Sequence, residues 1–119
     1  MAEHNDLGRR GEELAVDHLK SSGYQILERN YRHGRIEVDI IAQIDSTLAV
    51  IEVKTRSSDA FGSPKEFIKA KQISNLTLAI NDYVIKNELD VEVRFDIISI
   101  VYSNDECKLE HLKDAFYHF

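Results

Sequence analysis

The sequence predicts an α+β or mixed α/β layer fold with the element order α-β-β-β-α-β. Three observations lead to this prediction: an amphipathic helical pattern opens the chain, three runs rich in β-branched residues follow, and a second amphipathic helix precedes a fourth such run. The chain has 119 residues, the length of one domain, and its 43% hydrophobic content is enough for a core. We therefore expect a single domain over residues 1–119.

Local signals define the first helix and the strands. Asp6 can cap a helix that runs to about Ser22, and Gly23 can close it. The apolar stripe of this helix consists of Leu7, Leu14, Ala15 and Leu19. We expect strands at residues 25–31, 35–43, 47–55 and 91–102, and a last short element within residues 108–116.

The second helix has the clearest start. After a loop over residues 56–62, Ser63 occupies the N-cap position, Pro64 the first helical position and Glu66 the third, which is the capping-box pattern. The helix is expected to end near Asn87 and to face the core with Ile73, Leu76, Ile80 and Val84. A weaker apolar stripe on its far side consists of Phe67, Leu78 and Ile85. That stripe is either a partner surface or a set of scattered surface residues, and the second is commoner.

The composition favours a soluble protein of the cytoplasm. A single cysteine, Cys107, excludes an internal disulfide and any zinc site that needs two thiolates. Residues 1–10 lack the apolar stretch of a signal peptide, and no apolar run is long enough to span a bilayer. The net charge of −6 arises mainly in residues 72–119, which hold 4 basic and 9 acidic side chains. On charge alone, a solvated mixed-charge surface is favoured over nucleic-acid binding.

Charged side chains recur with strand spacing in the two central strands. Because alternate residues of a strand share a face, Glu37 and Asp39 point one way from their strand, and Glu52 and Lys54 one way from the next. The apolar neighbours of each pair are expected on the opposite face. A hairpin centred on residues 45–46 pairs residues whose numbers add up to 91, which places Asp39 opposite Glu52 and Glu37 opposite Lys54. An odd-length loop or a bulge would break this register.

Two opposed carboxylates need a compensating cation, because like charges about 4.5–5.5 Å apart are destabilising. Lys54 supplies part of that charge, and a site built from oxygen ligands suits Mg²⁺ or Mn²⁺. The five histidines are scattered along the sequence, which favours structural roles for them. The alternative to a metal site is an exposed polar face, on which Glu37 and Lys54 would form an ion pair worth about 0–1 kcal/mol.

Longer motifs accompany these residues. Asp39 followed by Glu52-Val53-Lys54, in the predicted element order, resembles the PD-(D/E)XK nuclease superfamily. More closely, nearly the whole chain resembles the uncharacterised YraN-like bacterial family, which is akin to archaeal Holliday-junction resolvases. The resemblance implies a restriction-endonuclease-like core with a mixed central sheet flanked by helices. The motifs that carry it are residues 8–15, 23–24, 29–32, 51–56, 61–62, 71–72, 94–96 and 113–116.

Carried over residue by residue, the resemblance implies a metal-dependent DNA endonuclease. Asp39 and Glu52 would hold Mg²⁺ or Mn²⁺, with the Val53 carbonyl as a further ligand. Lys54 would orient or help to deprotonate the attacking water and would stabilise charge on the phosphate. Such a divalent ion generates the nucleophile and neutralises the anionic phosphodiester.

Two further acidic residues match the family pattern. Glu12, on the first helix, matches an acidic position that approaches the metal or its waters in related resolvases, and an ordinary surface position is its alternative. Glu37 matches the acidic residue two places before the Asp. The sequence departs from the family at Ile36, where the family usually has glycine; the nearest glycine here is Gly34.

Nucleic-acid contact is expected from nearby cations: Arg32, Arg35, Arg56 and Lys71. Phosphate contacts from such residues give sequence-independent, salt-sensitive affinity, and branched or repair intermediates are candidate substrates. For Arg32 and Arg35, a solvated surface is the alternative. A resolvase would work as a homodimer on a two-fold-symmetric junction. Two other functions stay open: a nucleic-acid-binding module of the same fold without catalysis, and a protein-interaction adaptor that uses the far side of the second helix.

Overall fold

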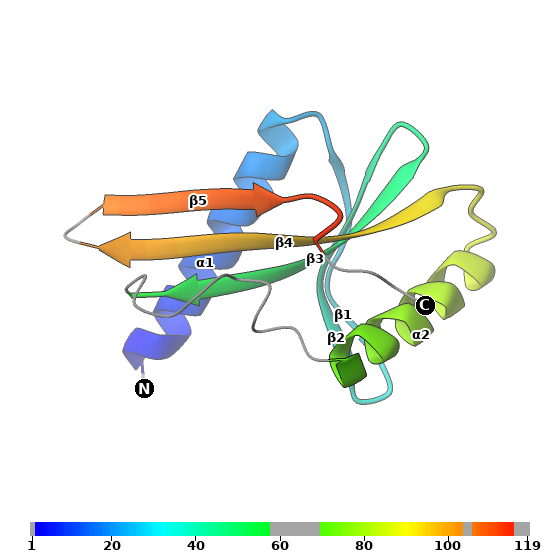
Figure 1. The fold of residues 1–119 in the computed structure, drawn as a ribbon, viewed down its shortest axis with the longest axis horizontal. Helices are drawn as coiled ribbons and strands as arrows, with labels where there is room; N and C mark the ends of the chain where they lie inside the picture. The colour runs from blue at the N-terminus through cyan, green and yellow to red at the C-terminus, as the bar shows by residue number, and fades with distance from the viewer. Residues whose placement is uncertain (1, 58–69, 104–105, 116–119) are drawn as a thin grey trace.

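The computed structural model describes residues 2–57, 70–103 and 106–115, with side chains from Gly8 onward in the first helix. The elements, drawn in Figure 1, are α1 (Ala2–Ser21), β1 (Gln25–His33), β2 (Ile36–Ile44), β3 (Thr47–Arg56), α2 (Ala70–Lys86), β4 (Glu92–Ser103) and β5 (Glu106–Leu112). The predicted fold class and element order are confirmed. The expected last element is the strand β5, which begins two residues earlier than predicted.

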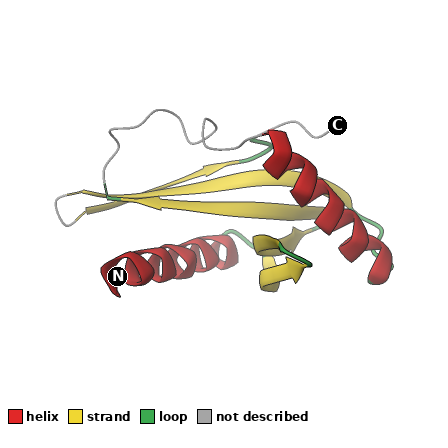
Figure 2. Cartoon of the chain, turned by 90° about the horizontal axis from the view of Figure 1, so that it is seen from below, coloured by secondary structure: helices red, strands yellow, loops and turns green. Residues whose placement is uncertain are grey.

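The five strands form one mixed sheet in the order β1-β2-β3-β4-β5. Among the described strands, β3 and β4 are the one parallel pair, and α2 lies in the crossover that a parallel pair requires. Figure 2 shows α1 lying along one face of the long strands, and α2 packs against the other face. Within the described residues, no helix combines the length and the apolar character that crossing a membrane requires.

Each face of the sheet has its own hydrophobic core. In β3 the buried side chains alternate, so that Leu48 and Val50 pack under α2 whereas Ala49 and Ile51 pack under α1. The helical contribution to the α2 core comes from Leu76, Ala79, Ile80 and Tyr83, with Ile73 and Val84 partly buried. The helical contribution to the α1 core comes from Ala15, Val16 and Leu19, with Leu14 partly buried. The predicted stripes of both helices therefore face the sheet. Leu7 is left out of this statement because its side chain is not among those that the structure describes.

The predicted start of α1 is wrong. The helix begins at Ala2 rather than after Asp6, because nothing in residues 2–5 breaks a helix and a cap contributes only about 1 kcal/mol. Its end agrees with the prediction, since Ser21 is the last residue and Gly23 adopts a φ of +94°. The capping box and Phe67, both within residues 63–67, lie outside the described residues.

The central strands β2 and β3 are paired along only part of their length. Their ladder runs from Ile44 with Thr47 to Ile40 with Ile51, and every pair adds up to 91, as predicted. Before Ile40, β2 is paired with β1 alone, whereas after Ile51, β3 continues to Arg56 beside β4 alone. The two strands therefore separate, and we call the space between residues 36–39 of β2 and 52–56 of β3 the strand fork.

β2 is distorted where the strand fork opens. Val38 packs into the α2 core whereas Ile40 packs into the α1 core, although residues two apart in a regular strand share a face. The expected common face for the apolar residues of β2 is therefore wrong. On β1, Asn30 has a φ of +54°, and the register shifts between Ile26 and Glu28. Such irregularities increase local twist, which turns the β1–β2 ribbon away from β3 at Asp39.

Candidate functional site

The strand fork holds two largely buried carboxylates. Asp39 lies just beyond the last ladder pair, and its Oδ2 accepts a 2.8 Å hydrogen bond from the Val53 N–H. This bond replaces the one that β2 no longer supplies to β3. Glu52 is 6% exposed, and its Oε2 accepts a 3.1 Å hydrogen bond from Nε2 of Gln72 on α2. Its Oε1 is buried and has no hydrogen-bond partner among the described residues.

Burial raises the pKa of both carboxyl groups above their ordinary values. For Glu52, the charge of Asp39 raises the pKa further. For Asp39, the hydrogen bond from Val53 and the charge of Lys54 oppose the shift without cancelling it. Without a compensating cation, the pair therefore retains protons that free carboxyl groups would have released.

The metal-free protein is expected to lose stability as the pH rises above about 4.5. The native state holds protons on Asp39 and Glu52 that the unfolded chain has already released, so each pH unit costs up to about 1.4 kcal/mol per retained proton. Thermal unfolding in EDTA, from about pH 5 to about pH 9, measures the slope. Glu52→Gln should flatten the profile, whereas Glu92→Gln, at an exposed position on β4, should not. A wild-type profile that rises with pH would contradict the prediction.

Three more charged side chains act on the carboxylate pair: Lys54, Glu12 and Glu37. Lys54 follows Glu52 by two residues on β3, and its positive charge counteracts the effect of burial on the pKa of both carboxyl groups. Glu12 comes from α1, and after burial its negative charge is a further cause of the raised pKa of Asp39. The Glu12 Oε1 is buried without a hydrogen-bond partner in the described part of the chain. Glu12 therefore belongs to the strand fork rather than to open surface.

Glu37 lies at the rim of the strand fork. It is exposed and forms a 3.0 Å ion pair with Arg32, its partner in the β1–β2 ladder. The predicted position opposite Lys54 is wrong, because β2 has left β3 before Glu37. Gly34, the displaced glycine, adopts a φ of +63° in the β1–β2 turn, where the missing Cβ removes the strain.

The four predicted nucleic-acid-binding cations occupy three places. Arg32 and Arg35 are exposed on the β1–β2 ribbon. Arg56 is partly buried at the end of β3, two residues beyond Lys54. Lys71 is exposed at the start of α2, beside the Gln72 that contacts Glu52.

The donor set of the strand fork fits a hard divalent cation. Within a strand, the N–H and C=O of one residue point to the same edge, so the Val53 carbonyl faces the fork, as its N–H does. Together with the carboxylates of Asp39 and Glu52, this gives oxygen ligands alone. Across residues 2–57, 70–103 and 106–115, no three His, Cys, Asp or Glu side chains are close enough to hold an ion by themselves. A site with two carboxylates is sufficient for Mg²⁺, because this ion commonly binds one or two carboxylates and keeps several waters.

Gln72 is a site residue that none of the sequence patterns above predicted. Its amide group donates to Glu52 from α2, so it fixes the orientation of one site carboxylate. A signal was present: Gln72 precedes the buried Leu76 by four residues and is therefore a polar residue on the core-facing stripe of the helix.

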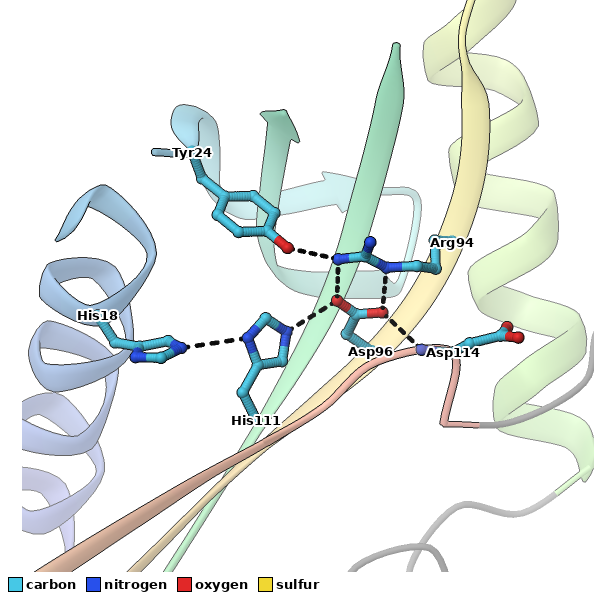
Figure 3. A network of polar contacts seen from close by, with 6 residues as sticks. All are labelled: His18, Tyr24, Arg94, Asp96, His111 and Asp114. Atoms are coloured by element: carbon cyan, nitrogen blue, oxygen red, sulfur yellow. Dashed lines mark hydrogen bonds and ion pairs between the residues drawn. The ribbon is translucent and has the colours of Figure 1, made fainter. Parts of the chain in front are cut away.

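A second polar cluster surrounds Asp96 of β4 and includes His18 of α1 (Figure 3). Asp96 on β4 is fully buried and accepts four hydrogen bonds. Arg94 donates through Nε at 2.9 Å and Nη2 at 2.8 Å, His111 donates at 2.8 Å, and the Asp114 N–H donates at 3.0 Å. Burial by itself would raise the pKa of Asp96, but these hydrogen bonds outweigh it and hold the pKa below its ordinary value.

The same cluster connects α1 to the sheet. Nη2 of Arg94 donates to the Tyr24 hydroxyl at 2.6 Å, and His18 on α1 lies 3.2 Å from the His111 ring (Figure 3). Two histidines far apart in the sequence therefore meet, which their scattered positions did not indicate. Their contacts join α1, β4 and β5, so the structural role predicted for histidines holds for this pair.

The fold and the site define an α+β protein with a five-stranded mixed sheet flanked by two helices, an architecture compatible with a restriction-endonuclease-like core. The model of the uncharacterised protein family UPF0102 matches residues 11–100. The chain belongs to this family, and the resemblance to the YraN-like family is thereby confirmed.

Relatives with the same family name match along the full chain. The UPF0102 protein of Christiangramia forsetii is 56% identical over 119 residues, and that of Flavobacterium psychrophilum is 55% identical; both alignments cover 100% of each chain. The UPF0102 protein of Bacteroides thetaiotaomicron is 43% identical over 117 residues, covering 98% of this chain and 97% of the relative. The strand fork therefore lies well within the region shared with these proteins.

Proposed function

We propose that this chain is a divalent-cation-dependent endonuclease that hydrolyses DNA phosphodiester bonds. One observation carries the proposal: the buried Glu52 and the partly buried Asp39 interact in the strand fork, with the charge of Lys54 acting on both. Two neighbouring carboxylates in a poorly solvated place destabilise the charged state. A bound cation would remove that cost, and the oxygen ligands present suit Mg²⁺ or Mn²⁺.

Each residue of the strand fork has a role in this proposal. Asp39, Glu52 and the Val53 carbonyl would hold the ion, which supplies Lewis-acid charge and a hydroxide nucleophile when bound. Gln72 restrains Glu52 through Oε2, and this leaves Oε1 without a protein partner among the described residues. Lys54 would orient the attacking water and place a positive charge beside the phosphate, where negative charge develops during the reaction.

The cations around the fork would hold the DNA backbone. Arg32, Arg35 and Lys71 are exposed, and Arg56 lies at the end of the strand that carries Glu52 and Lys54. Such side chains contact phosphates, and phosphate contacts do not distinguish one base sequence from another. We therefore propose recognition of strand structure, with branched or repair intermediates as the substrate class.

Cleavage of plasmid, single-stranded and four-way-junction DNA in Mg²⁺, Mn²⁺ or EDTA tests the function. Cutting is expected only with a divalent cation, and it should disappear in folded Asp39→Ala and Lys54→Ala proteins.

Lys71→Ala should weaken DNA binding and reduce its salt dependence, whereas Lys86→Ala, at the other end of α2, should change neither.

Other outcomes would replace the proposal. DNA binding without cutting on any substrate would indicate a binding module of the same fold. Absence of both DNA cutting and DNA binding would favour a protein-interaction adaptor. Leu78 and Ile85 on α2, which are 58% and 76% exposed, would then form its partner surface.

A further inference from the structure

Gly11 marks a very close approach between α1 and the sheet. A Cβ added to Gly11 would overlap the Thr55 Oγ1 on β3 and would lie 3.1 Å from the Thr55 Cβ and Cγ2. A side chain at this position fits only if the helix or Thr55 moves. Gly8, one turn earlier on the same helix, differs, because its Cβ position has nothing within 4 Å. The need for glycine is therefore specific to residue 11.

A glycine inside a helix is a local disadvantage. It lowers stability by roughly 0.5–1 kcal/mol relative to alanine, because the unfolded chain gains backbone freedom. At Gly11 the missing side chain allows α1 to lie against Thr55, three residues beyond Glu52 on β3. The missing Cβ therefore permits this close contact between α1 and the end of β3.

The next residue in α1 is Glu12. Its Oε1 is buried and unpartnered within the described residues, although a buried carboxylate oxygen ordinarily accepts a hydrogen bond. Gly11, the residue before it, lies against Thr55, three residues beyond Glu52 on β3, so Glu12 enters the interface between α1 and β3 beside the strand fork. A cation at the Asp39–Glu52 pair would be attracted by this third negative charge.

We propose that Gly11 is a positioning residue whose missing side chain lets α1 deliver the Glu12 carboxylate to the Asp39–Glu52 pair. The inference rests on the proposed function, because the delivery matters only if the pair holds a divalent ion. Glu12 then acts on the waters of the ion, and Gly11 acts only through Glu12. A shift of α1 at Thr55 would withdraw this charge while leaving both ligands on the sheet in place.

Mn²⁺ affinity, measured by titration calorimetry without DNA, tests the positioning role. Glu12→Gln is expected to weaken binding by on the order of 10-fold. Gly11→Ala should weaken it by a similar factor, and Gly8→Ala, the matched control, should leave it unchanged. The double variant Gly11→Ala/Glu12→Gln should bind no more weakly than Glu12→Gln alone. Additive losses would show that Gly11 acts independently of Glu12 and would overturn the proposal.

A compensating substitution guards against a folding defect. Thr55→Ala removes the Oγ1 and Cγ2 atoms, so Gly11→Ala/Thr55→Ala should recover most of the Mn²⁺ affinity that Gly11→Ala loses. Thr55→Ala alone serves as the reference. If the wild-type protein binds no Mn²⁺, the proposed function itself fails. Only the positioning role fails in two other cases, in which the wild type does bind Mn²⁺. In the first, the folded Gly11→Ala protein binds Mn²⁺ as tightly as the wild type. In the second, Gly11→Ala/Thr55→Ala does not recover the Mn²⁺ affinity that Gly11→Ala loses.

Discussion

Asp39→Asn is expected to abolish cation-dependent DNA cleavage, lowering the rate by on the order of 10³-fold or more. The substitution removes the negative charge that would hold the ion. It keeps an acceptor oxygen for the Val53 N–H, so the hydrogen bond across the strand fork can persist. Single-turnover cleavage at saturating Mg²⁺ measures the loss without a contribution from product release.

Measuring the stability of Asp39→Asn distinguishes the loss of cleavage at a folded site from unfolding of the protein. Asp39 is a carboxyl group whose burial raises its pKa, so the asparagine variant should be more stable than the wild type in EDTA at neutral and alkaline pH. Glu92→Gln, at an exposed position at the start of β4, should keep cleavage near the wild-type rate. A folded Asp39→Asn protein that cuts as fast as the wild type would exclude Asp39 as a metal ligand.

Asp96→Ala is expected to destabilise the protein by about 3–5 kcal/mol, because it removes one partner from a buried ionic cluster. The side chains of Arg94 and His111 are 23% and 7% exposed, and both would lose their acceptor. The Asp114 N–H would lose its partner as well. For a chain of this length, the midpoint of thermal unfolding should fall by on the order of 10–20 °C.

An exposed ion pair provides the control. Arg29 and Glu13 are 2.7 Å apart, about as close as Arg94 and Asp96, but their side chains are 37% and 56% exposed. Glu13→Gln should therefore change the free energy of unfolding by less than about 1 kcal/mol. Urea unfolding of both variants measures the difference. Equal losses would mean that burial does not govern the strength of these pairs.

The hairpin that carries the site could be predicted from the sequence because its register is local. The turn at residues 45–46 is flanked by strands of matched pattern, so one symmetric pairing buries the apolar side chains. The limit of that pairing was not predictable. It depends on the positive φ of Asn30 and the register shift near Glu28 in β1, and neither leaves a pattern in β2 or β3.

Contacts between distant polar residues were also beyond sequence patterns. Asp39, Glu52 and Lys54 follow strand periodicity, so their common location could be predicted. Gln72 and Glu12 reach the fork from two helices on opposite faces of the sheet, and periodicity within a helix does not specify the strand residue that it meets. The contact of His18 with His111 spans 93 positions in the sequence.

The strand order also bears on the sequence of folding events. β1, β2 and β3 are joined by short turns, whereas β4 reaches β3 only after residues 57–91 have closed a long loop. Local pairings form faster than non-local ones, so the three-stranded meander can assemble before α2 and β4 dock. This early unit already contains Asp39 and Glu52. Their repulsion therefore opposes the first stage of folding, and protonation or a divalent cation should speed the assembly of the whole sheet.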